Sequence, residues 1–412
     1  MKRLALVLLL LAATDAHAQW TRVEEIPQAN VYSVFTNGDT IAVGSDGDAF
    51  VSVNGGATWI PSAPIVPDTI AVEDVVVRNG RMYAGTQGLG VFVSTDLGAS
   101  WQGFNQGLVG GFLNSQLRIM DLCMRGDSLF AATGGSGAWM RNLQAGSWSK
   151  YGAIFEPAQA SNMESIAASP TRLFACAGFN GDAYWRDRAD PDWTITYFIN
   201  NTVAAGLASL AAHWTGNSWL VGTNIGVYRS PSGQSPWIYT DFGLQPTYFA
   251  SFAQKGGVVF THFASPQGTG IEFSTDDGVH WQVLDALPAI FTYAVGISGA
   301  TMYGGRVDGL WRRPIGTVGV PAASGGAGLH FAIAGSNPVR NEVRFRFDLA
   351  EPARVRLQVV DVAGRLRGGI EESRAAGTGE LRLPTLGLAP GVYLARLTVN
   401  GRTEVVRFVR SR

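Results

Sequence analysis

The sequence predicts an all-β protein, with a seven-bladed β-propeller followed by a small Ig-like β-sandwich. Two observations carry this prediction. A tryptophan recurs at a nearly constant interval along most of the chain, and charged and apolar residues alternate near its end. The composition agrees, because 52 glycines, 11% aromatic residues and only 15% charged residues are typical of a turn-rich β protein. No segment shows a convincing helical pattern.

The repeat is marked by tryptophans separated by 39, 42, 47, 45, 44 and 44 residues, namely Trp20, Trp59, Trp101, Trp148, Trp193, Trp237 and Trp281. Short apolar runs separated by polar or Gly-rich turns precede each tryptophan except the first. Four short strands in one such repeat make one propeller blade. The innermost strands are expected at about residues 31–36, 71–78, 117–124, 165–169, 207–213, 248–253 and 293–298.

The first strand of the mature chain is expected to complete the last blade. After the sixth hairpin, residues 298–305 and 309–313 match the second and third strands of a blade, but no fourth strand follows. Residues 19–23 supply a matching fourth strand, which would close the ring and remove exposed sheet edges. The alternative is a six-bladed ring with a disordered tail.

A hairpin motif, S-x-D-x-G-x-S-W, occupies residues 94–101 and returns at 52–59 and 274–281 with one departure in each copy. The aspartate is expected to accept backbone N–H groups, the glycine to adopt a positive φ, and the tryptophan to anchor the next strand. These residues are predicted to be structural: Asn54, Gly56, Trp59, Asp96, Gly98, Trp101, Asp276, Gly278 and Trp281.

The motif resembles the Asp-box of sialidase-type and BNR-repeat β-propellers. At the level of the repeat, the chain is also similar to photosystem-assembly and sortilin-like propellers. The sialidase resemblance implies three arginines from different blades and a tyrosine nucleophile. The predicted innermost strands contain only Arg78 and Arg118, so a retaining sialidase is disfavoured.

The chain is predicted to divide into a signal peptide (1–18), the propeller (19–314), a flexible Gly/Ala-rich linker (315–330) and the sandwich (331–412). The signal peptide is indicated by Lys2 and Arg3, an apolar run over residues 4–13 and a small-residue cleavage site at 16–18. No apolar run is long enough to span a membrane. Cys123 and Cys176 lie in different repeats and are expected to be buried thiols.

Residues 331–412 resemble the type A sorting domain of the type IX secretion system. The matching segments are Asn337-Pro338, Val360 to Arg365, Leu386 to Tyr393 and Glu404 to Val409. The resemblance implies export to the extracellular space or outer surface of a Gram-negative bacterium, with the secretion machinery as partner. Residues 19–330 hold 15 Lys/Arg and 23 Asp/Glu, whereas residues 331–412 hold 14 Arg and 8 Asp/Glu. Because these arginines alternate with apolar residues, a solvated sheet face is favoured over nucleic-acid binding.

Four carboxylates on or beside the predicted innermost strands are the candidate catalytic residues: Glu73, Asp74, Asp121 and Glu164. A pair of them could hydrolyse a β-glucan, but hydrogen bonding to backbone groups is the favoured interpretation. No His/Cys cluster has metal-ligand spacing, and no cofactor is expected. Residues 44–48 could hold a calcium ion through oxygen ligands, although a polar turn is favoured.

Long loops between blades and within them are expected at residues 102–116, 151–163, 242–248 and 262–270. They carry the candidate binding residues, which are Phe104, Phe112, Phe155, Phe242, Tyr248 and His262. Function tends to lie on such loops, although more than half of the aromatic residues are expected to be wedges between blades. The favoured hypothesis is a non-catalytic module that binds a protein or glycan. The alternative is a glycoside hydrolase that uses paired carboxylates.

Overall fold

The computed structural model describes residues 20–109, 112–144, 146–152, 162–178, 183–198, 207–240, 251–265, 268–287, 292–315, 330–334, 339–349, 351–361, 365–399 and 402–411. The chain divides into two compact units, Met1–Val318 and Gly319–Arg412. Among the described residues, no helix is both long and apolar enough to cross a membrane.

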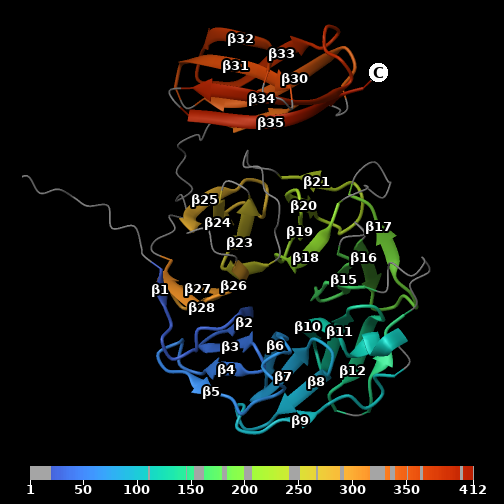
Figure 1. Ribbon diagram of the computed structural model, residues 1–412. Coiled ribbons are helices and arrows are strands. Elements are labelled where there is room, and N and C mark those ends of the chain that lie inside the picture. Colours follow the sequence, from blue (N-terminus) through green and yellow to red (C-terminus); the bar gives the residue numbers. More distant parts are fainter. Residues whose placement is uncertain are drawn as a thin grey trace, which may run out of the picture. The chain divides into compact units, whose positions relative to one another are not determined.

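Seven four-stranded antiparallel sheets form the described part of the first unit. Figure 1 shows them arranged in a ring, with the first strands of the sheets around its centre. Six of the sheets are each made of four consecutive strands: β2 (Val31–Asn37), β3 (Thr40–Ser45), β4 (Ala49–Ser52) and β5 (Ile60–Pro61); β6 (Val72–Arg78), β7 (Arg81–Thr86), β8 (Gly90–Ser94) and β9 (Gln102–Gly103); β10 (Ile119–Arg125), β11 (Ser128–Thr133), β12 (Gly137–Asn142) and β13 (Ser149–Lys150); β14 (Ser165–Ala168), β15 (Arg172–Cys176), β16 (Ala183–Asp187) and β17 (Thr194–Thr196); β18 (Ser209–Trp214), β19 (Trp219–Thr223), β20 (Val227–Ser230) and β21 (Ile238–Tyr239); and β22 (Phe252–Lys255), β23 (Val258–Ser265), β24 (Gly268–Ser274) and β25 (Gln282–Leu287). The seventh sheet is made of β26 (Thr292–Ser298), β27 (Thr301–Arg306), β28 (Gly309–Pro314) and the N-terminal strand β1 (Thr21–Arg22).

The last sheet is built from both ends of the first unit. Strand β1 pairs antiparallel with β28, with Thr21 opposite Arg312, and the N–H of Val23 donates to the carbonyl of Leu310 at 2.8 Å. The side chain of Val23 is fully buried in a core shared with the sheet of β2. The N-terminal segment therefore supplies the fourth strand of a sheet whose other strands lie almost 300 residues later, as the register of the tryptophans predicts.

Neighbouring sheets are joined by the recurring tryptophans. The indole N–H of Trp148 donates to the carbonyl of Phe104 at 2.6 Å, and that of Trp193 donates to the carbonyl of Tyr151 at 2.6 Å. Each acceptor lies three residues after the tryptophan of the preceding repeat. Trp237 and Trp281 also donate their indole N–H to the preceding repeat, whereas the N–H groups of Trp20, Trp59 and Trp101 have no partner within the described residues. The packing of the large apolar ring between sheets therefore explains why a tryptophan recurs at this step.

A β-bulge near the start of the first strand is repeated around the ring. The antiparallel register skips one residue in each of five sheets: Tyr32, Glu73, Met120, Leu210 and Tyr293. A bulged residue is left out of the ladder, so its side chain can be aimed differently from its neighbours. These bulges gather a set of side chains at one end of the first strands.

The hairpin motif forms the hydrogen bonds that its residue types predict. The hydroxyl oxygen of Ser94 accepts the N–H of Gly98 at 2.8 Å, and Asp96 accepts the N–H of Ser100 at 2.9 Å. Gly98 has a φ of 89°, a conformation that favours glycine. The copies at 52–59 and 274–281 form the same bonds with Asn54 and Asp276 in the place of the aspartate.

Two segments differ from the sequence prediction. Residues 262–270 were expected to form a long loop, but they belong to the hairpin of β23 and β24, in which His262 pairs with Ile271. This expectation was wrong because a buried histidine and nearby glycines read as loop residues in the sequence. The loop expected over 102–116 contains β9 and a 3-10 helix, Phe112–Leu117, although no helix was expected. Cys123 and Cys176 are both free thiols; Cys176 is buried, as expected, whereas Cys123 is only partly buried.

The second unit contains two antiparallel sheets in its described residues. One is made of β29 (His330–Ile333), β30 (Glu342–Leu349) and β33 (Gly377–Pro384), and the other of β32 (Leu366–Arg374), β31 (Ala353–Asp361), β34 (Gly391–Val399) and β35 (Arg402–Arg410). The alternating apolar residues of both sheets, such as Phe345 and Leu397, form one core. Asn337-Pro338 and residues 362–364 of the sorting-domain resemblance lie outside the described residues.

Candidate functional site

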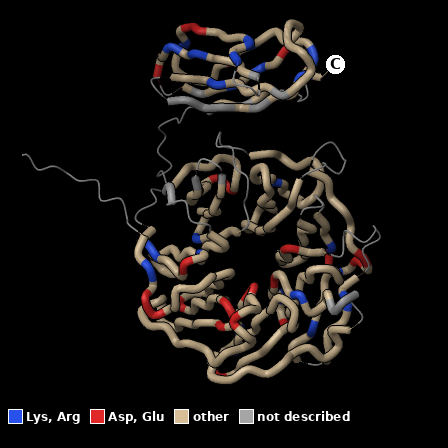
Figure 2. Tube along the Cα trace, in the orientation of Figure 1, with Lys and Arg blue, Asp and Glu red and all other residues tan. Residues whose placement is uncertain are grey.

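Six side chains from five sheets, or from the turns that join them, converge near the axis of the ring and form what we call the axial cluster: Tyr32, Asp46, Glu73, Arg118, Glu164 and Tyr293. The tyrosines and Glu73 are bulge residues of first strands, and Glu164 directly precedes β14. Figure 2 shows acidic positions around the middle of the ring. Because the sheets of Glu73 and Glu164 are separated by the sheet of β10, these two residues can approach one another only near the axis, and the ring itself assembles the cluster.

The two tyrosines lie against one another on the adjacent strands β2 and β26. Their ring centroids are 5.0 Å apart and the rings are tilted by 48°. The Tyr32 hydroxyl donates to Asp46 at 2.8 Å, and the side-chain amide of Asn30 donates to the same carboxylate at 2.9 Å. Burial, followed by this hydrogen bond, raises the pKa of Tyr32 above its ordinary value. Tyr32 is therefore a poor candidate for an activated nucleophile at neutral pH.

Glu73 is the most perturbed carboxylate of the axial cluster. Burial and then the negative charge of Glu164 raise the pKa of Glu73 to about 7, although the guanidinium of Arg118 acts in the opposite direction. No hydrogen-bond donor within the described part of the chain offsets its burial. Glu164 instead accepts the side-chain amide of Asn162 at 3.0 Å. Glu73 is thus a half-buried acid that faces a like charge.

Asp74 and Asp121, two of the four catalytic candidates, bind the backbone of the next sheet. Asp74 accepts the N–H of Leu122 at 3.0 Å, and Asp121 accepts the N–H of Ile166 at 2.7 Å. Burial raises the pKa of Asp74 to about 6, against the effect of its backbone donors. The favoured sequence interpretation, backbone hydrogen bonding, accounts for both residues.

The same position of other sheets carries serine. Ser165 accepts the N–H of Ala212 at 3.4 Å, and Ser251 accepts the N–H of Val295 at 3.1 Å. In four of the seven sheets, a short side chain with an acceptor oxygen at this position therefore ties the first strand to that of the next sheet, whereas Ala211 and Ala294 hold the position in two others. This repeated role separates Asp74 and Asp121 from the axial cluster.

Of the candidate binding residues, Phe104 is described in full. Its ring packs against Tyr83 with centroids 5.5 Å apart, and the guanidinium of Arg141 lies 3.5 Å from its centroid. These contacts join two sheets, as expected of an inter-blade wedge. Phe112 begins the 3-10 helix, and its side chain is not described. Phe155, Phe242 and Tyr248 lie outside the described residues.

His262 lies inside β23 with only 1% of its surface exposed. Neither ring nitrogen has a hydrogen-bond partner within the described residues, and burial lowers the pKa of His262 to about 4. At the corresponding position, the other sheets carry small residues such as Gly44, Gly85 and Gly305. At these glycines an added Cβ would lie only 2.3 to 2.6 Å from an atom of the next sheet, whereas the position in β23 accommodates a buried imidazole.

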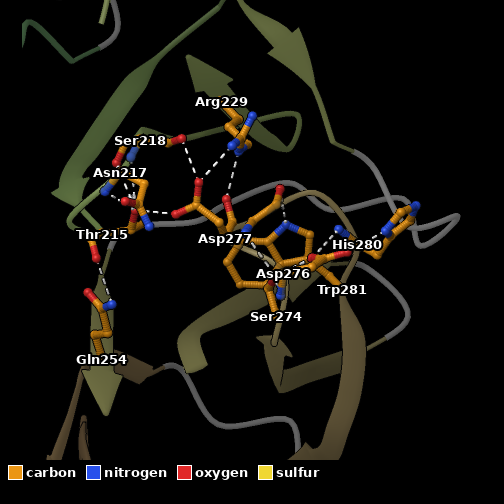
Figure 3. Close-up of polar contacts among 11 residues, drawn as sticks. Thr215, Asn217, Ser218, Arg229, Gln254, Ser274, Asp276, Asp277, His280 and Trp281 are labelled. Atoms are coloured by element: carbon orange, nitrogen blue, oxygen red, sulfur yellow. Dashed lines mark hydrogen bonds and ion pairs between the residues drawn. The ribbon is translucent and has the colours of Figure 1, made fainter. Parts of the chain in front are cut away.

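The third hairpin motif joins its sheet to the preceding one. Figure 3 shows Asp277 surrounded by Thr215, Ser218 and Arg229 of the neighbouring sheet. The Ser218 hydroxyl donates to Asp277 at 2.6 Å, and the Arg229 guanidinium donates to the same carboxylate at 2.6 Å. This contact is not predicted by the motif, because Asp277 occupies one of its variable positions. All of these groups bind one another, which indicates a structural role.

The possible calcium loop at 44–48 has a different role. Asp46 binds Asn30 and Tyr32, as described above. Within the described residues, no group of three or more His, Cys, Asp or Glu side chains is placed to hold a metal ion. The axial cluster itself holds three carboxylates, two phenol rings and one guanidinium.

No family model and no curated protein matches the chain. Among solved structures, the chain is similar to YCF48 from Cyanidioschyzon merolae, with 12% identity, a TM-score of 0.56 and coverage of 72% of this chain and 98% of that one. It is similar to the WD40 repeats of RRP9, with 13% identity, a TM-score of 0.53 and coverage of 72% and 99%. It is also similar to the extracellular domain of the hybrid two component system BT3049 from B. thetaiotaomicron, with 13% identity, a TM-score of 0.55 and coverage of 93% and 56%. These likenesses identify the fold as a β-propeller.

Proposed function

We propose that the protein is an exported, non-catalytic β-propeller module that binds a protein or glycan at the axial cluster. The observation that carries this proposal is the convergence of aromatic and charged side chains from five sheets on one spot, where all of them are half-buried except the exposed Arg118. Such a spot offers convergent polar groups on a rigid scaffold, as binding sites do. Two similar propellers fit this role: one is an extracellular domain and another, a YCF48, is bound to the D1 peptide.

The finer architecture belongs to the same proposal. The seven sheets are the blades of an Asp-box propeller that β1 closes, and the two sheets of the second unit are an Ig-like sandwich. The alternating strands and the matching motif residues support a sorting domain of the type IX secretion system in residues 331–412. This domain would direct the protein to the outer surface or the extracellular space, with the secretion machinery as its partner.

An array experiment tests the binding function. The mature chain, labelled with a fluorophore, is applied to glycan and peptide arrays, and the retained ligands are then titrated by calorimetry. Tyr32→Leu and Tyr293→Leu should abolish binding, because they remove the aromatic faces of the cluster. Asp39→Asn is the matched control, since Asp39 is an exposed acid in the turn between β2 and β3. Binding that survives both tyrosine substitutions would contradict the proposed site.

A second candidate function, glycoside hydrolysis, is favoured by the relation between Glu73 and Glu164. A carboxyl that keeps its proton near neutral pH beside a second carboxylate is the arrangement of a general acid and its partner. A hydrolase would release reducing ends from a β-glucan, and Glu73→Gln and Glu164→Gln would each abolish that release. A wild-type chain that releases none from a panel of β-glucans would eliminate this candidate.

A further inference from the structure

We infer that the axial cluster recognises a lysine or arginine side chain, carried by a polypeptide segment that lies across the same face of the propeller. This inference rests on the proposed binding function and names the class of its ligand. It has two parts, the preference for a cation and the preference for a polypeptide, and different residues carry each part.

The charge balance of the axial cluster favours a cation. Three carboxylates, those of Asp46, Glu73 and Glu164, face a single guanidinium, that of Arg118. Arg118 makes no ion pair with them within the described residues, and its guanidinium donates instead to the carbonyl of Gly134 at 3.4 Å. Arg118 therefore offsets the repulsion between Glu73 and Glu164 only in part, and a cation placed between them would relieve the rest.

The aromatic residues of the cluster favour the same kind of group. The tilted rings of Tyr32 and Tyr293 present π faces beside the carboxylates, and a cation over such a face is attracted by the ring quadrupole. Met120, at the bulge position of β10, adds an apolar side chain to the set. Lysine and arginine combine an apolar stem with a charged head, so the stem would lie on the rings while the head reaches Glu73 and Glu164.

The turns on this face favour a polypeptide over a small amine. The turn after β7 is bonded to the entry of the next first strand, since the N–H of Gly88 donates to Leu117 at 3.1 Å. The turn after β19 is bonded to the entry of its own first strand, since the N–H of Asn224 donates to the carbonyl of Ala208 at 3.1 Å. These bonds place the tips of both turns at the end of the ring where the axial cluster lies.

Apolar side chains occupy the tips of these turns and of the equivalent turn after β27. Leu89 is 40% exposed, Ile225 is 36% exposed and Val307 is 40% exposed. An extended polypeptide could cover these exposed apolar residues, which surround the charged axial cluster, and so remove them from water. At the same time, one of its basic side chains could enter the axial cluster. A small amine would leave the apolar residues in water.

The test uses the mature chain, residues 19–412, and a set of acetylated, amidated peptides of sequence GLAXALG. The central residue X is lysine, arginine, glutamine or glutamate, and binding is measured by isothermal titration. The lysine and arginine peptides should bind at least about tenfold more tightly than the glutamine peptide, and the glutamate peptide should bind most weakly. Equal binding of all four peptides, or no binding by any of them, would overturn the inference.

Substitutions in the protein then assign the effect to the cluster. Glu73→Gln with Glu164→Gln should remove the preference for lysine over glutamine, and Arg118→Ala should tighten binding of the lysine peptide because it removes the competing cation. Tyr32→Phe should retain affinity that Tyr32→Leu loses, and Asp39→Asn should change nothing. A preference for lysine that survives the double glutamine substitution would also overturn the inference. If a neutral or acidic ligand binds and the tyrosine substitutions abolish it, the inference fails while the proposed binding function stands.

Discussion

Asp96 and Asn54 occupy the same position in two copies of the hairpin motif and accept the same backbone N–H. Asp96 binds Ser100 at 2.9 Å, and Asn54 binds Thr58 at 3.0 Å. Hydrogen bonds from the hydroxyls of Ser100 and Ser94 lower the pKa of Asp96 to about 2. Because the carboxylate oxygens of Asp96 already accept these hydrogen bonds, Asp96 is a poor general base. An Asp or Asn at this position is explained by the turn that its side chain stabilises.

Substitutions at this motif test the structural role. Ser94→Ala leaves the buried N–H of Gly98 without its acceptor and should cost about 1–3 kcal/mol of unfolding free energy. Asp96→Ala should lower the melting temperature, whereas Asp96→Asn should nearly preserve it, because Asn54 does the same work in the first copy. Chemical denaturation and calorimetry measure both effects. A loss of ligand binding by Asp96→Ala without any loss of stability would contradict the structural assignment.

Glu73 should make the stability of the protein depend on pH in an unusual direction. Its pKa is raised from 4.5 to about 7 in the folded state, so the folded chain binds a proton that the unfolded chain releases. The free energy of unfolding should therefore fall as the pH rises from about 4.5 to 7. Melting curves across this range should show less of this fall in Glu73→Gln. Identical pH profiles for both proteins would contradict the raised pKa.

The residue scale also shows where prediction from the sequence ends. The hydrogen bonds of Asp96 and the backbone role of Asp74 follow from residue type and position, and both could be predicted. The axial cluster could not, because Tyr32 and Tyr293 lie 261 residues apart and reach one another only through ring closure. The sequence does show that both tyrosines and Glu73 occupy the same position of their repeats. It does not show the β-bulge that turns their side chains toward the axis, because no residue type marks that bulge.

At the scale of elements, β1 connects the beginning of the first unit to its end. Its pairing with β28 covers the outer edge of that sheet, and Val23 and Ile26 are fully buried just after it. Deleting residues 19–23 should lower the melting temperature by about 5 °C or more, because it unpairs a strand and removes the buried side chain of Val23. Thr21→Ala is the control, since it keeps the strand. An unchanged melting temperature after the deletion would exclude closure by this strand.

The contact of Asp277 with Arg229 is a second link between elements. Asp277 has a φ of 64°, and Leu97, at the same motif position of another copy, has a φ of 57°. Asp277→Leu therefore suits the backbone and removes only the polar contact. Because the pair is partly exposed, a double-mutant cycle with Arg229→Met should give a coupling energy of about 1 kcal/mol. A coupling energy of zero would show that the contact does not stabilise the junction between the two sheets.

At the scale of the whole molecule, the two units differ in charge and in the pattern of their strands. The first unit is acidic and carries the axial cluster, whereas residues 331–412 are rich in arginine and form their own core. The division into two units can be predicted from the sequence, because the alternation of charged and apolar residues and the spacing of the tryptophans are both patterns of residues along the chain. The identity of the ligand is not local, since it depends on side chains that several sheets bring together.

This division leads to a prediction about truncation. Every described strand of the seven sheets lies between residues 21 and 314, and the second compact unit begins at Gly319. A chain that ends at Gly319 should therefore fold, melt at the same temperature as the first unit of the full chain, and keep its affinity for any ligand of the axial cluster. Calorimetry and titration of both chains measure this. Loss of folding or of affinity would show that the second unit contributes to the propeller.

The same truncated chain tests the proposed sorting role in its native host. Because the signal peptide remains, the truncated chain should still cross the inner membrane, but without residues 320–412 it should accumulate in the periplasm. The full chain, expressed at the same level, should instead reach the cell surface or the medium, where added protease and antibody can reach it. Cell fractionation with a periplasmic marker protein distinguishes the two locations. A truncated chain found at the cell surface would show that the first unit carries its own export signal, and the sorting role of the second unit would then be wrong.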